Sequence, residues 1–228
     1  MKSLIEIFIR KTKNKNFSFS EEISANYIFH LSMRKIIALL RGFLKFQSGN
    51  FIFIGKNTVI HNKNQIKIKR NISIDNDCYI DALSKDGITL GNNVSIHKRC
   101  IIECTGNLSH IGKGLAIGNN VGIGSNSFLG CAGGITIGDD TIIGNFVSFH
   151  AENHNYSDED KPIRLQGVNH QGIIIGKNCW IGAKATILDG AIIEDGCIIA
   201  AGAVVKQGLY QENSIYAGVP AKFIKKRF

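Results

Sequence analysis

A six-residue repeat constrains the fold of this chain more than any other feature. Residues 173–208 divide without a gap into the hexads IIIGKN, CWIGAK, ATILDG, AIIEDG, CIIAAG and AVVKQG. The third position is always Ile or Val, and the first is Ile, Cys or Ala. The apolar face of a helix recurs every three to four residues, so this period excludes a helix. It fits a short strand followed by a two-residue corner.

Further copies of the hexad lie upstream. Residues 135–152 read ITIGDD, TIIGNF and VSFHAE, residues 115–132 read LAIGNN, VGIGSN and SFLGCA, and weaker copies begin at Ile88 and near Phe51. Three hexads close one coil, and stacked coils bury the third-position side chains in an axial core. Six unbroken hexads argue against an ordinary β-sandwich. We therefore predict an all-β solenoid over residues 49–228, with most of the isoleucines in its core.

The formal charge of +9 is concentrated in the N-terminal part of the chain. Residues 1–70 carry 14 Lys and Arg against 3 Asp and Glu, whereas the rest carries 13 against 15. We interpret residues 1–48 as a basic helical segment, with a helix over 20–46 that starts at Ser20. This amphipathic helix fits an anionic membrane surface, or a cap on the open end of the solenoid. A nucleic-acid partner is not expected, because no recognisable binding module accompanies the charge.

The sequence also bears on localisation and on the cysteines. No apolar run is long enough to span a bilayer, and the first 30 residues lack the apolar region and cleavage site of a signal peptide. We expect a cytoplasmic protein, with peripheral contact to the inner face of the membrane as a further option.

The six cysteines form no CxxC pair, and Cys179 and Cys197 occupy small first positions of hexads. Reduced, structural thiols are therefore expected.

Several segments resemble a known family. The hexads, the segment NCWIGAKATILDG at 178–190 and the ending AAGAVVKQ…IYAGVPAKFIKKR at 200–227 resemble the left-handed β-helix acyltransferases. The most similar subgroup contains galactoside, maltose and surface-polysaccharide O-acetyltransferases. The resemblance implies a left-handed parallel β-helix with an N-terminal helical segment, assembled as a homotrimer. It also implies acetyl transfer from acetyl-CoA to a hydroxyl of a carbohydrate acceptor, with a lipid-linked acceptor as an option, in surface-polysaccharide biosynthesis.

An interruption of the repeat marks the candidate catalytic region. The hexads stop after Glu152 and resume at Ile173, so residues 153–172 form an extended loop. A solenoid accommodates such an insertion only outside the stack, and long loops of this kind are usually functional or disordered. A neutral imidazole can take the proton of a hydroxyl as its oxygen attacks a thioester. The family carries a histidine base on this loop, so the resemblance assigns His154 as the general base.

The same loop supplies expected contacts to the acceptor, namely Asn153, Asn155, Asp158 and Arg164. The acids at 158–160 either orient the imidazole or are simply solvated, and Arg164 is a candidate partner for them or for a phosphate. The family's galactoside enzymes bind the acceptor through an Asn on the preceding coil. Gly124 stands at the matching position here, and Asn126 is the nearest substitute. This departure leaves the acceptor sugar open.

In the family, coenzyme A lies in a groove between two subunits of the trimer, against the last coils. Small side chains there let backbone amides approach the pantetheine, and lysines meet the phosphates. The backbone N–H groups of Gly144 and Gly182 are candidate donors to the thioester oxyanion. The matching positions for binding acetyl-CoA are Trp180, Ala183, Ala201, Gly202, Lys206, Gly218, Pro220 and Lys222.

Other functions remain as alternatives. His150, His154 and His170 could together hold zinc, but the spacing HAENH does not match that of the γ-class carbonic anhydrases, so no metal is expected. N-acetylation of an amino sugar, or transfer to a serine or xenobiotic acceptor, is the competing enzymatic interpretation. A catalytically silent solenoid that acts as a scaffold is a second alternative, from a different functional class.

Overall fold

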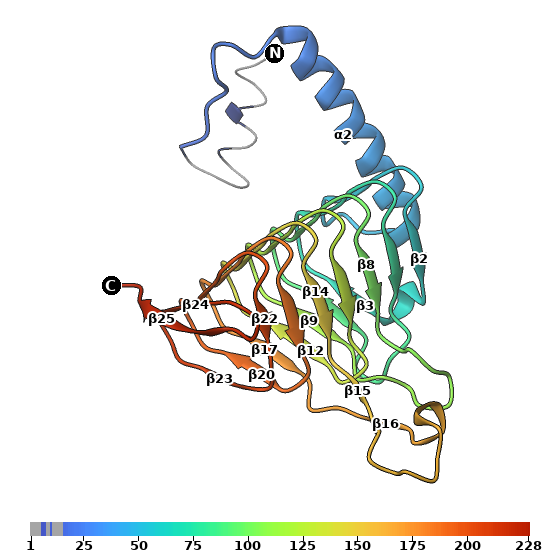
Figure 1. The fold of residues 1–228 in the computed structure, drawn as a ribbon. Coiled ribbons are helices and arrows are strands. Elements are labelled where there is room, and N and C mark those ends of the chain that lie inside the picture. The colour runs from blue at the N-terminus through green and yellow to red at the C-terminus, as the bar shows by residue number, and fades with distance from the viewer. Residues whose placement is uncertain (1–5, 8–9, 11–15) are drawn as a thin grey trace.

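The chain folds into a triangular prism of stacked coils with one long helix at its N-terminal end (Figure 1). The computed structural model describes residues 6–7, 10 and 16–228, so most of the first 15 residues of the predicted N-terminal segment lie outside the described residues. Each coil contributes one strand to each of three sheets, and strands of successive coils pair in parallel. The predicted β-helix with an N-terminal helical segment is therefore confirmed.

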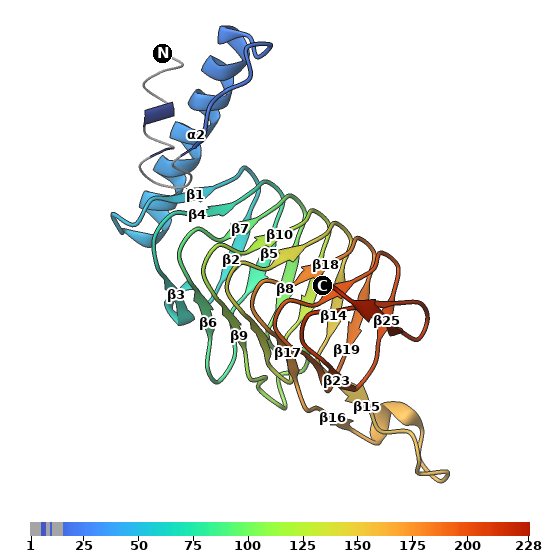
Figure 2. The same ribbon diagram turned by 90° about the vertical axis from the view of Figure 1, so that its left-hand side faces the viewer.

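The three sheets run along the length of the stack (Figure 2). Sheet A contains β1 (Ile52–Ile54), β4 (Ile72–Ile74), β7 (Ser95–Ile96), β10 (Gly122–Ile123), β13 (Ile142–Ile143), β18 (Trp180–Ile181), β21 (Ile198–Ile199), β24 (Ser214–Ala217) and the antiparallel β25 (Lys222–Lys226). Sheet B contains β2 (Val59–His61), β5 (Tyr79–Asp81), β8 (Ile101–Glu103), β11 (Phe128–Gly130), β14 (Ser148–His150), β19 (Thr186–Leu188) and β22 (Val204–Val205). Sheet C contains β3 (Ile66–Ile68), which follows the short 3-10 helix η1 (Lys63–Gln65), β6 (Ile88–Leu90), β9 (Leu115–Ile117), β12 (Ile135–Ile137), β17 (Ile173–Ile175), β20 (Ala191–Ile193) and β23 (Gly208–Tyr210).

The hexad maps directly onto the inside and outside of the prism. In the hexad CWIGAK, Cys179 and Ile181 point inward and are buried, while Trp180 between them points outward and is 53% exposed. Successive side chains of a strand alternate between the two faces of a sheet. The parallel register then stacks Ile143, Ile181 and Ile199 in one row of the core. Each fully buried side chain of this kind contributes about 1.5–3 kcal/mol.

All six cysteines are buried inside the prism. Cys179 and Cys197 lie at first positions of their hexads, where the sequence predicts small core residues. Burial raises the pKa of the Cys179 thiol to about 11 and also raises the pKa of Cys197. Both thiols are therefore protonated and unreactive at neutral pH.

One corner of the prism carries a ladder of side-chain amides. Asn71 donates to Asn93, Asn93 to Asn120, and Asn120 to Asp140, over distances of 2.7, 2.8 and 2.8 Å. All four residues have positive φ, a conformation that Asn and Asp tolerate better than other side chains. The turn residues of the repeat therefore close each corner and tie it to the next.

The three edges of the prism differ in length. Four residues join sheet A to sheet B in every coil, for example 144–147 between β13 and β14, and three or four join sheet C to sheet A. The edge from sheet B to sheet C, called the B–C edge below, ranges from the two residues Asp189 and Gly190 to the segment 151–172. All long insertions of the stack therefore lie on one edge.

Helix α2 (Ala25–Phe46) packs against the first coil. It crosses β1 at Gly42, where a side chain would collide with the carbonyl oxygen of Ile52. The predicted start at Ser20 is wrong, because Ser20 forms a turn and Ser24 is the N-cap, accepting a hydrogen bond from the Tyr27 N–H. In the described part of the chain, no helix combines the length and apolarity needed to cross a membrane.

Candidate functional site

Residues 151–172 leave the stack on the B–C edge as a small hairpin, which projects at the bottom of Figure 1. Its stem is the antiparallel pair β15 (Asn153–His154) and β16 (Val168–Asn169), and its outer part contains the 3-10 helix η2 (Ile163–Leu165). His154 faces Val168 in this pair. The insertion therefore has secondary structure of its own, and it holds His154 near the stem rather than at the mobile tip of a loop.

Gln166 organises the outer part of the hairpin. Its side-chain amide donates to the carbonyl oxygens of Asp158 (2.8 Å) and Lys161 (2.7 Å) and accepts from the Asp158 N–H (3.0 Å). Asn155 donates to the Gln166 carbonyl (3.1 Å) and accepts from the side chain of Asn169. The side-chain amide of Asn155, a predicted contact to the acceptor sugar, is thus hydrogen-bonded within the hairpin.

A buried carboxylate anchors the base of the hairpin. Asp189 is 2% exposed, and its oxygens accept hydrogen bonds from the N–H groups of Gln171 (2.9 and 3.0 Å) and Gly172 (2.7 Å). The side chain of Asn153 donates to the same carboxylate over 3.4 Å. Charge-assisted hydrogen bonds of this type are stronger than neutral ones. Asp189 therefore fixes both ends of the insertion to the next coil.

The role of Asp189 was missed from the sequence, although the repeat contains a signal for it. Asp139 and Asp195 occupy the same fifth position of their hexads, and each accepts an N–H from the corner of the preceding coil, at Asn119 and Lys177 respectively. A fifth-position Asp is thus a cap for the coil before it. At Asp189 the preceding corner is the insertion itself.

The side chain of His154 is exposed, and its ring forms no hydrogen bond within the described residues. Asp158, one of the acids expected to orient it, pairs instead with Lys161 at 3.2 Å. Arg164, the other expected partner of these acids, is exposed and forms no ion pair in the described part of the chain. Both His154 and Arg164 are therefore available to a substrate.

His150 lies at the end of β14, next to the hairpin, and its ring centroid is 5.5 Å from that of Phe128. Desolvation by burial lowers the pKa of this imidazole, because burial disfavours its charged form. His150 is therefore a neutral residue at the base of the hairpin. Among the described residues, no group of three or more His, Cys, Asp and Glu side chains is arranged to hold a metal ion.

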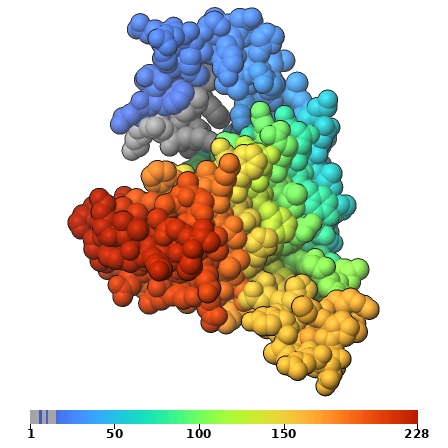
Figure 3. All heavy atoms as spheres, in the orientation of Figure 1, coloured from blue at the N-terminus to red at the C-terminus, as the bar shows by residue number. Residues whose placement is uncertain are grey.

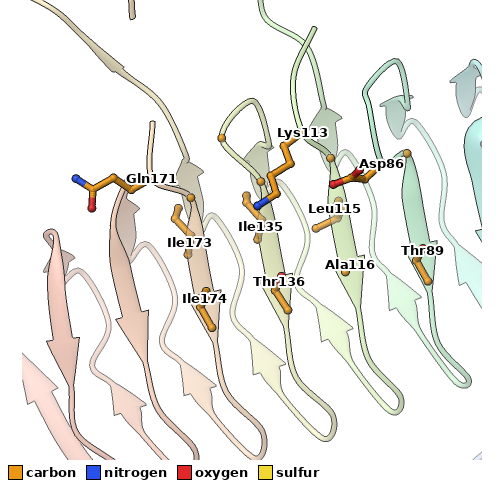
Figure 4. Close-up of a pocket in the computed structure, with 15 residues that line it drawn as sticks. Asp86, Thr89, Lys113, Leu115, Ala116, Ile135, Thr136, Gln171, Ile173 and Ile174 are labelled. Atoms are coloured by element: carbon orange, nitrogen blue, oxygen red, sulfur yellow. The ribbon is translucent and has the colours of Figure 1, made fainter. Parts of the chain in front are cut away.

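A shallow hollow of about 180 Å³ lies along the B–C edge beside the hairpin (Figure 4). A column of glycines forms its floor: Gly87, Gly114, Gly134 and Gly172 all have positive φ, and each is hydrogen-bonded through its carbonyl to the next coil. No side chain projects from this column, so the edge is hollowed. Lys113, Asp86 and Gln171 stand around it. Each of these glycines directly precedes a strand of sheet C, in GITL, GLAI, GITI and GIII, a recurrence that the hexads alone do not single out.

The residues predicted to bind acetyl-CoA are split between two edges. Ala183, Ala201 and Gly202 stack on the A–B edge, where the Gly202 N–H donates to the Ala183 carbonyl. Gly218 and Pro220 continue this column in the turn after β24, and Lys222 begins β25. Trp180 lies on the outer face of sheet A. Lys206 follows β22 and lies on the B–C edge, two coils further along the stack than the hairpin.

Asn126 also lies on the A–B edge, and its side-chain oxygen accepts from Arg99 Nε at 2.7 Å. It is therefore separated from His154 within one chain. The expectation that Gly144 or Gly182 donates to an oxyanion is wrong. The N–H of Gly144 donates to the Ile181 carbonyl (2.8 Å) and that of Gly182 to the Ile199 carbonyl (2.7 Å), so neither is free.

Family models match two stretches of the stack. Residues 172–207 match the bacterial transferase hexapeptide (six repeats), and residues 114–147 match the hexapeptide repeat of succinyl-transferase. Over these two stretches the chain is therefore similar to the hexapeptide-repeat transferases. The two matches flank the hairpin, so the family's repeat is interrupted where His154 lies.

Proteins similar to this chain include acyltransferases. WbbJ of Escherichia coli (strain K12), provisionally named a lipopolysaccharide biosynthesis O-acetyl transferase, is 32% identical over 99 residues, or 40% of this chain. The chain spans half the length of that relative. AntD, an N-acyltransferase from Bacillus cereus solved with dTDP and 3-hydroxybutyryl-CoA, is 27% identical with a TM-score of 0.51, covering 80% of this chain and 86% of AntD.

The fold itself recurs in a more distant structure. LpxA from Acinetobacter baumannii superposes with a TM-score of 0.55 at 17% identity, over 77% of this chain and 63% of LpxA. At that identity the likeness concerns the β-helix alone. It shows that the three stacked parallel sheets of this chain form an LpxA-like β-helix.

Proposed function

We propose that this protein transfers an acetyl group from acetyl-CoA to a hydroxyl of a sugar in cell-surface polysaccharide biosynthesis, with His154 as the general base. The observation that carries the proposal is the hairpin on the B–C edge, which interrupts the hexapeptide repeat and presents an exposed imidazole. The base of the hairpin, at Gln171 and Gly172, lines a glycine-rich hollow. The similarity to WbbJ supports a surface-polysaccharide acceptor.

The chemistry requires one proton acceptor. As the acceptor hydroxyl attacks the thioester carbonyl, its proton passes to the free nitrogen of the His154 ring. The C–S bond then breaks and the proton returns to the leaving coenzyme A thiolate, which leaves an acetyl ester on the sugar. The thioester is already activated, so no covalent enzyme intermediate is needed. Both nitrogens of the His154 ring are free for this role, because the ring forms no hydrogen bond among the described residues.

We further propose that the site is completed between two copies of the chain in a homotrimer. Within one chain, His154 lies on the B–C edge, whereas Ala183, Ala201 and Gly202 lie on the A–B edge. These two groups can act on one substrate only if the A–B edge of a neighbouring copy approaches the hairpin. The pantetheine then lies along small, accessible residues of one copy while His154 of the other faces the thioester, with Lys206 near the hairpin as a phosphate partner.

The acceptor is placed at the hairpin. Asn153 and Asn155 hold the stem through Asp189 and Asn169, so they shape the site and present their remaining polar atoms to the acceptor. Arg164 has no ionic partner among the described residues and is proposed to meet a phosphate of an activated or lipid-linked sugar. The hollow beside the stem, with Lys113 and Asp86 at its rim, offers polar groups to sugar hydroxyls.

The similarity to AntD favours a second candidate function. That N-acyltransferase was solved with dTDP and an acyl-CoA, so N-acylation of an amino sugar carried on a nucleotide is the alternative for this chain. An amine acceptor needs the same base to remove its proton. Product analysis separates the two functions, because an ester is cleaved by mild base and an amide is not.

Replacement of His154 tests the proposal. We expect His154→Ala to reduce acetyl transfer at least about 100-fold, the lower limit for loss of a general base, with unchanged acetyl-CoA binding in calorimetry. His170→Ala, an exposed histidine at the other end of the insertion, is the matched control and should keep activity. Equal activity of His154→Ala and the wild type would refute the assignment, and absence of acetyl-CoA binding by the wild type would favour a silent scaffold.

A further inference from the structure

Helix α2 has a face that the β-helix does not cover. Ile28, Ala38 and Gly42 are buried and mark the side turned toward the rest of the protein. The opposite side exposes large apolar side chains, from 42% for Met33 to 75% for Leu44. We call this the apolar face of α2; it consists of Phe29, Met33, Ile36, Leu40, Phe43 and Leu44.

These six residues form one continuous stripe. They follow one another at intervals of three or four residues, apart from the neighbours Phe43 and Leu44, so they line the same side of the helix. Isolated exposed apolar residues are ordinary, but a contiguous patch of this kind marks an interaction surface. The helix extends beyond the stacked coils (Figure 3), and each of the six side chains is at least 42% exposed.

A basic stripe borders the apolar face. His30, Arg34, Arg41 and Lys45 recur at intervals of four and seven residues, and all but the partly buried Lys45 are exposed. Residues 25–46 contain no Asp or Glu at all. The helix is therefore amphipathic, with an apolar face on one side and, next to it, a basic stripe without acidic residues.

A hollow of about 400 Å³ opens where this basic stripe meets the first coil. Arg41 and Lys45 contribute the charged side chains of its lining, together with the apolar Leu44 and the polar Asn57 and Thr58. The ammonium group of Lys63 lies close by, donating to the Lys45 carbonyl at 3.0 Å. Two lining cations and hydrogen-bonding groups beside an apolar residue match a phosphate headgroup attached to an acyl chain.

We propose that α2 docks this protein on an anionic lipid bilayer. The apolar face enters the boundary between headgroups and acyl chains, and Arg41 and Lys45 meet headgroup phosphates at the hollow. A second copy of the chain is a poorer occupant, because two such helices would bring their cations together with no acid on either helix. The inference concerns binding to a surface, so it stands apart from the proposed acetyl transfer.

Vesicle sedimentation tests the proposal on the full chain. We expect binding to vesicles of phosphatidylglycerol and phosphatidylcholine, with a much weaker response to phosphatidylcholine alone and a decrease at high salt. Arg41→Gln/Lys45→Gln should weaken binding about 30-fold, since each basic residue near such a surface contributes about fivefold. Lys177→Gln/Lys225→Gln removes the same charge elsewhere and should leave binding within about twofold of the wild type, because charges remote from the surface are screened.

A second test variant and its matched control examine the apolar face of α2. Leu40→Asn/Leu44→Asn should weaken binding at least about tenfold, because two apolar side chains no longer enter the bilayer. Leu108→Asn/Leu209→Asn alters leucines of nearly equal exposure outside the helix and should bind like the wild type. Because all four residues are exposed, folding is expected to persist, and the charge-removing pair tests the proposal independently of apolar packing.

Four results would overturn the proposal. They are equal loss of binding in a test pair and its control, equal binding to neutral and anionic vesicles, complete competition by free inorganic phosphate, and a change in oligomeric state of the leucine pair with vesicle binding intact. The third would make the hollow a site for a soluble anion, and the fourth would make the face a contact between copies. Acetyl transfer to a soluble acceptor should be unchanged in every variant, which separates this inference from the proposed function.

Discussion

The A–B and B–C edges belong to the same prism but follow opposite rules. The A–B edge has four residues in every coil, and it accepts positive φ even at Arg99, Phe146 and Lys184, which are residues that rarely adopt it. The B–C edge uses glycine for this purpose and ranges from two residues to the hairpin of 151–172. The core requires register within each sheet, but it does not require every connection to be equally long.

This difference explains where the candidate chemistry lies. A uniform edge offers a long, repetitive surface suited to an extended ligand, and Ala183, Ala201 and Gly202 lie on it. A variable edge can carry a unique structure, and the hairpin with His154 lies there. The regular scaffold thus separates the edge that we propose to bind acetyl-CoA from the insertion that we propose to be catalytic. The two can be tested against each other.

Insertions should separate the edges most clearly. One Ser added between Lys184 and Ala185 shifts β19 by one residue and turns Ile187 out of the core, because strand side chains alternate. We expect a loss of about 4 kcal/mol or more, or failure to fold. The same Ser between Glu159 and Asp160, at the outer part of the hairpin, should change stability by no more than about 0.5 kcal/mol. Denaturant unfolding measures both; equal losses would mean that the edges do not differ.

The anchor of the hairpin should give a smaller effect. Asp189→Ala leaves the buried N–H groups of Gln171 and Gly172 without a partner, which should destabilise the protein by about 2–3 kcal/mol. Acetyl transfer should fall with it, because Asn153 and His154 lose their support. Asp195→Ala, at the same hexad position without an insertion above it, should cost about 1 kcal/mol and spare activity. Thermal unfolding and turnover of the pair provide the check, and identical behaviour would contradict the anchor role.

The smallest expected difference between the two edges concerns how the stability of the protein depends on pH. On the A–B edge, the hydrogen bond that Nδ1 of His97 donates to Oδ2 of Asp75, at 3.3 Å, raises the pKa of His97. The stability that this pKa shift contributes is present in full below pH 6.5 and is lost as the pH rises through the folded pKa of His97. On the B–C edge, burial lowers the pKa of His150, so its contribution is present above pH 6.5 and is lost as the pH falls through the folded pKa.

The two histidines should therefore act in opposite directions. His97→Gln should destabilise the protein more at pH 5.5 than at pH 8, and His150→Gln should flatten the decrease in stability toward acid. Each effect should stay below about 1 kcal/mol, because both side chains are partly solvated. Unfolding free energies of the two variants and the wild type, measured across this range, would contradict the account if both variants changed in the same direction.

The sequence was sufficient for the core of the fold. The hexads indicate which side chains face inward, because Cys179 and Ile181 lie on either side of the outward-facing Trp180 and both are buried. It was also sufficient to place the insertion, since 153–172 breaks the period. The start of α2 was misplaced because Ser20 and Ser24 are both suitable N-caps by residue type, and Ser24 is the one that caps the helix.

The arrangement of the candidate site could not be predicted in the same way. Where insertions interrupt the repeat, the period alone does not say which edge of the prism a residue occupies. His154 and Asn126 were therefore assigned to one acceptor site, although they lie on different edges. The glycine-lined hollow arises from residues in four successive coils. Each of its glycines directly precedes a strand of sheet C, but the hexads do not show that this edge of the prism is hollowed. Gly144 and Gly182 looked available to an oxyanion, but the parallel register uses their N–H groups.

A mixed-oligomer experiment tests the central claim that the two edges of different copies form one site. His154→Ala removes the base on the B–C edge, and Ala201→Trp blocks the A–B edge, where Ala201 is exposed. Each variant alone should be inactive. Co-expressed in equal amounts, random trimers pair an intact hairpin with an intact A–B edge at about a quarter of the sites, so about a quarter of wild-type acetyl transfer should return. No recovery in isolated mixed trimers would contradict the account, because it would place the base and the acetyl-CoA site in the same chain.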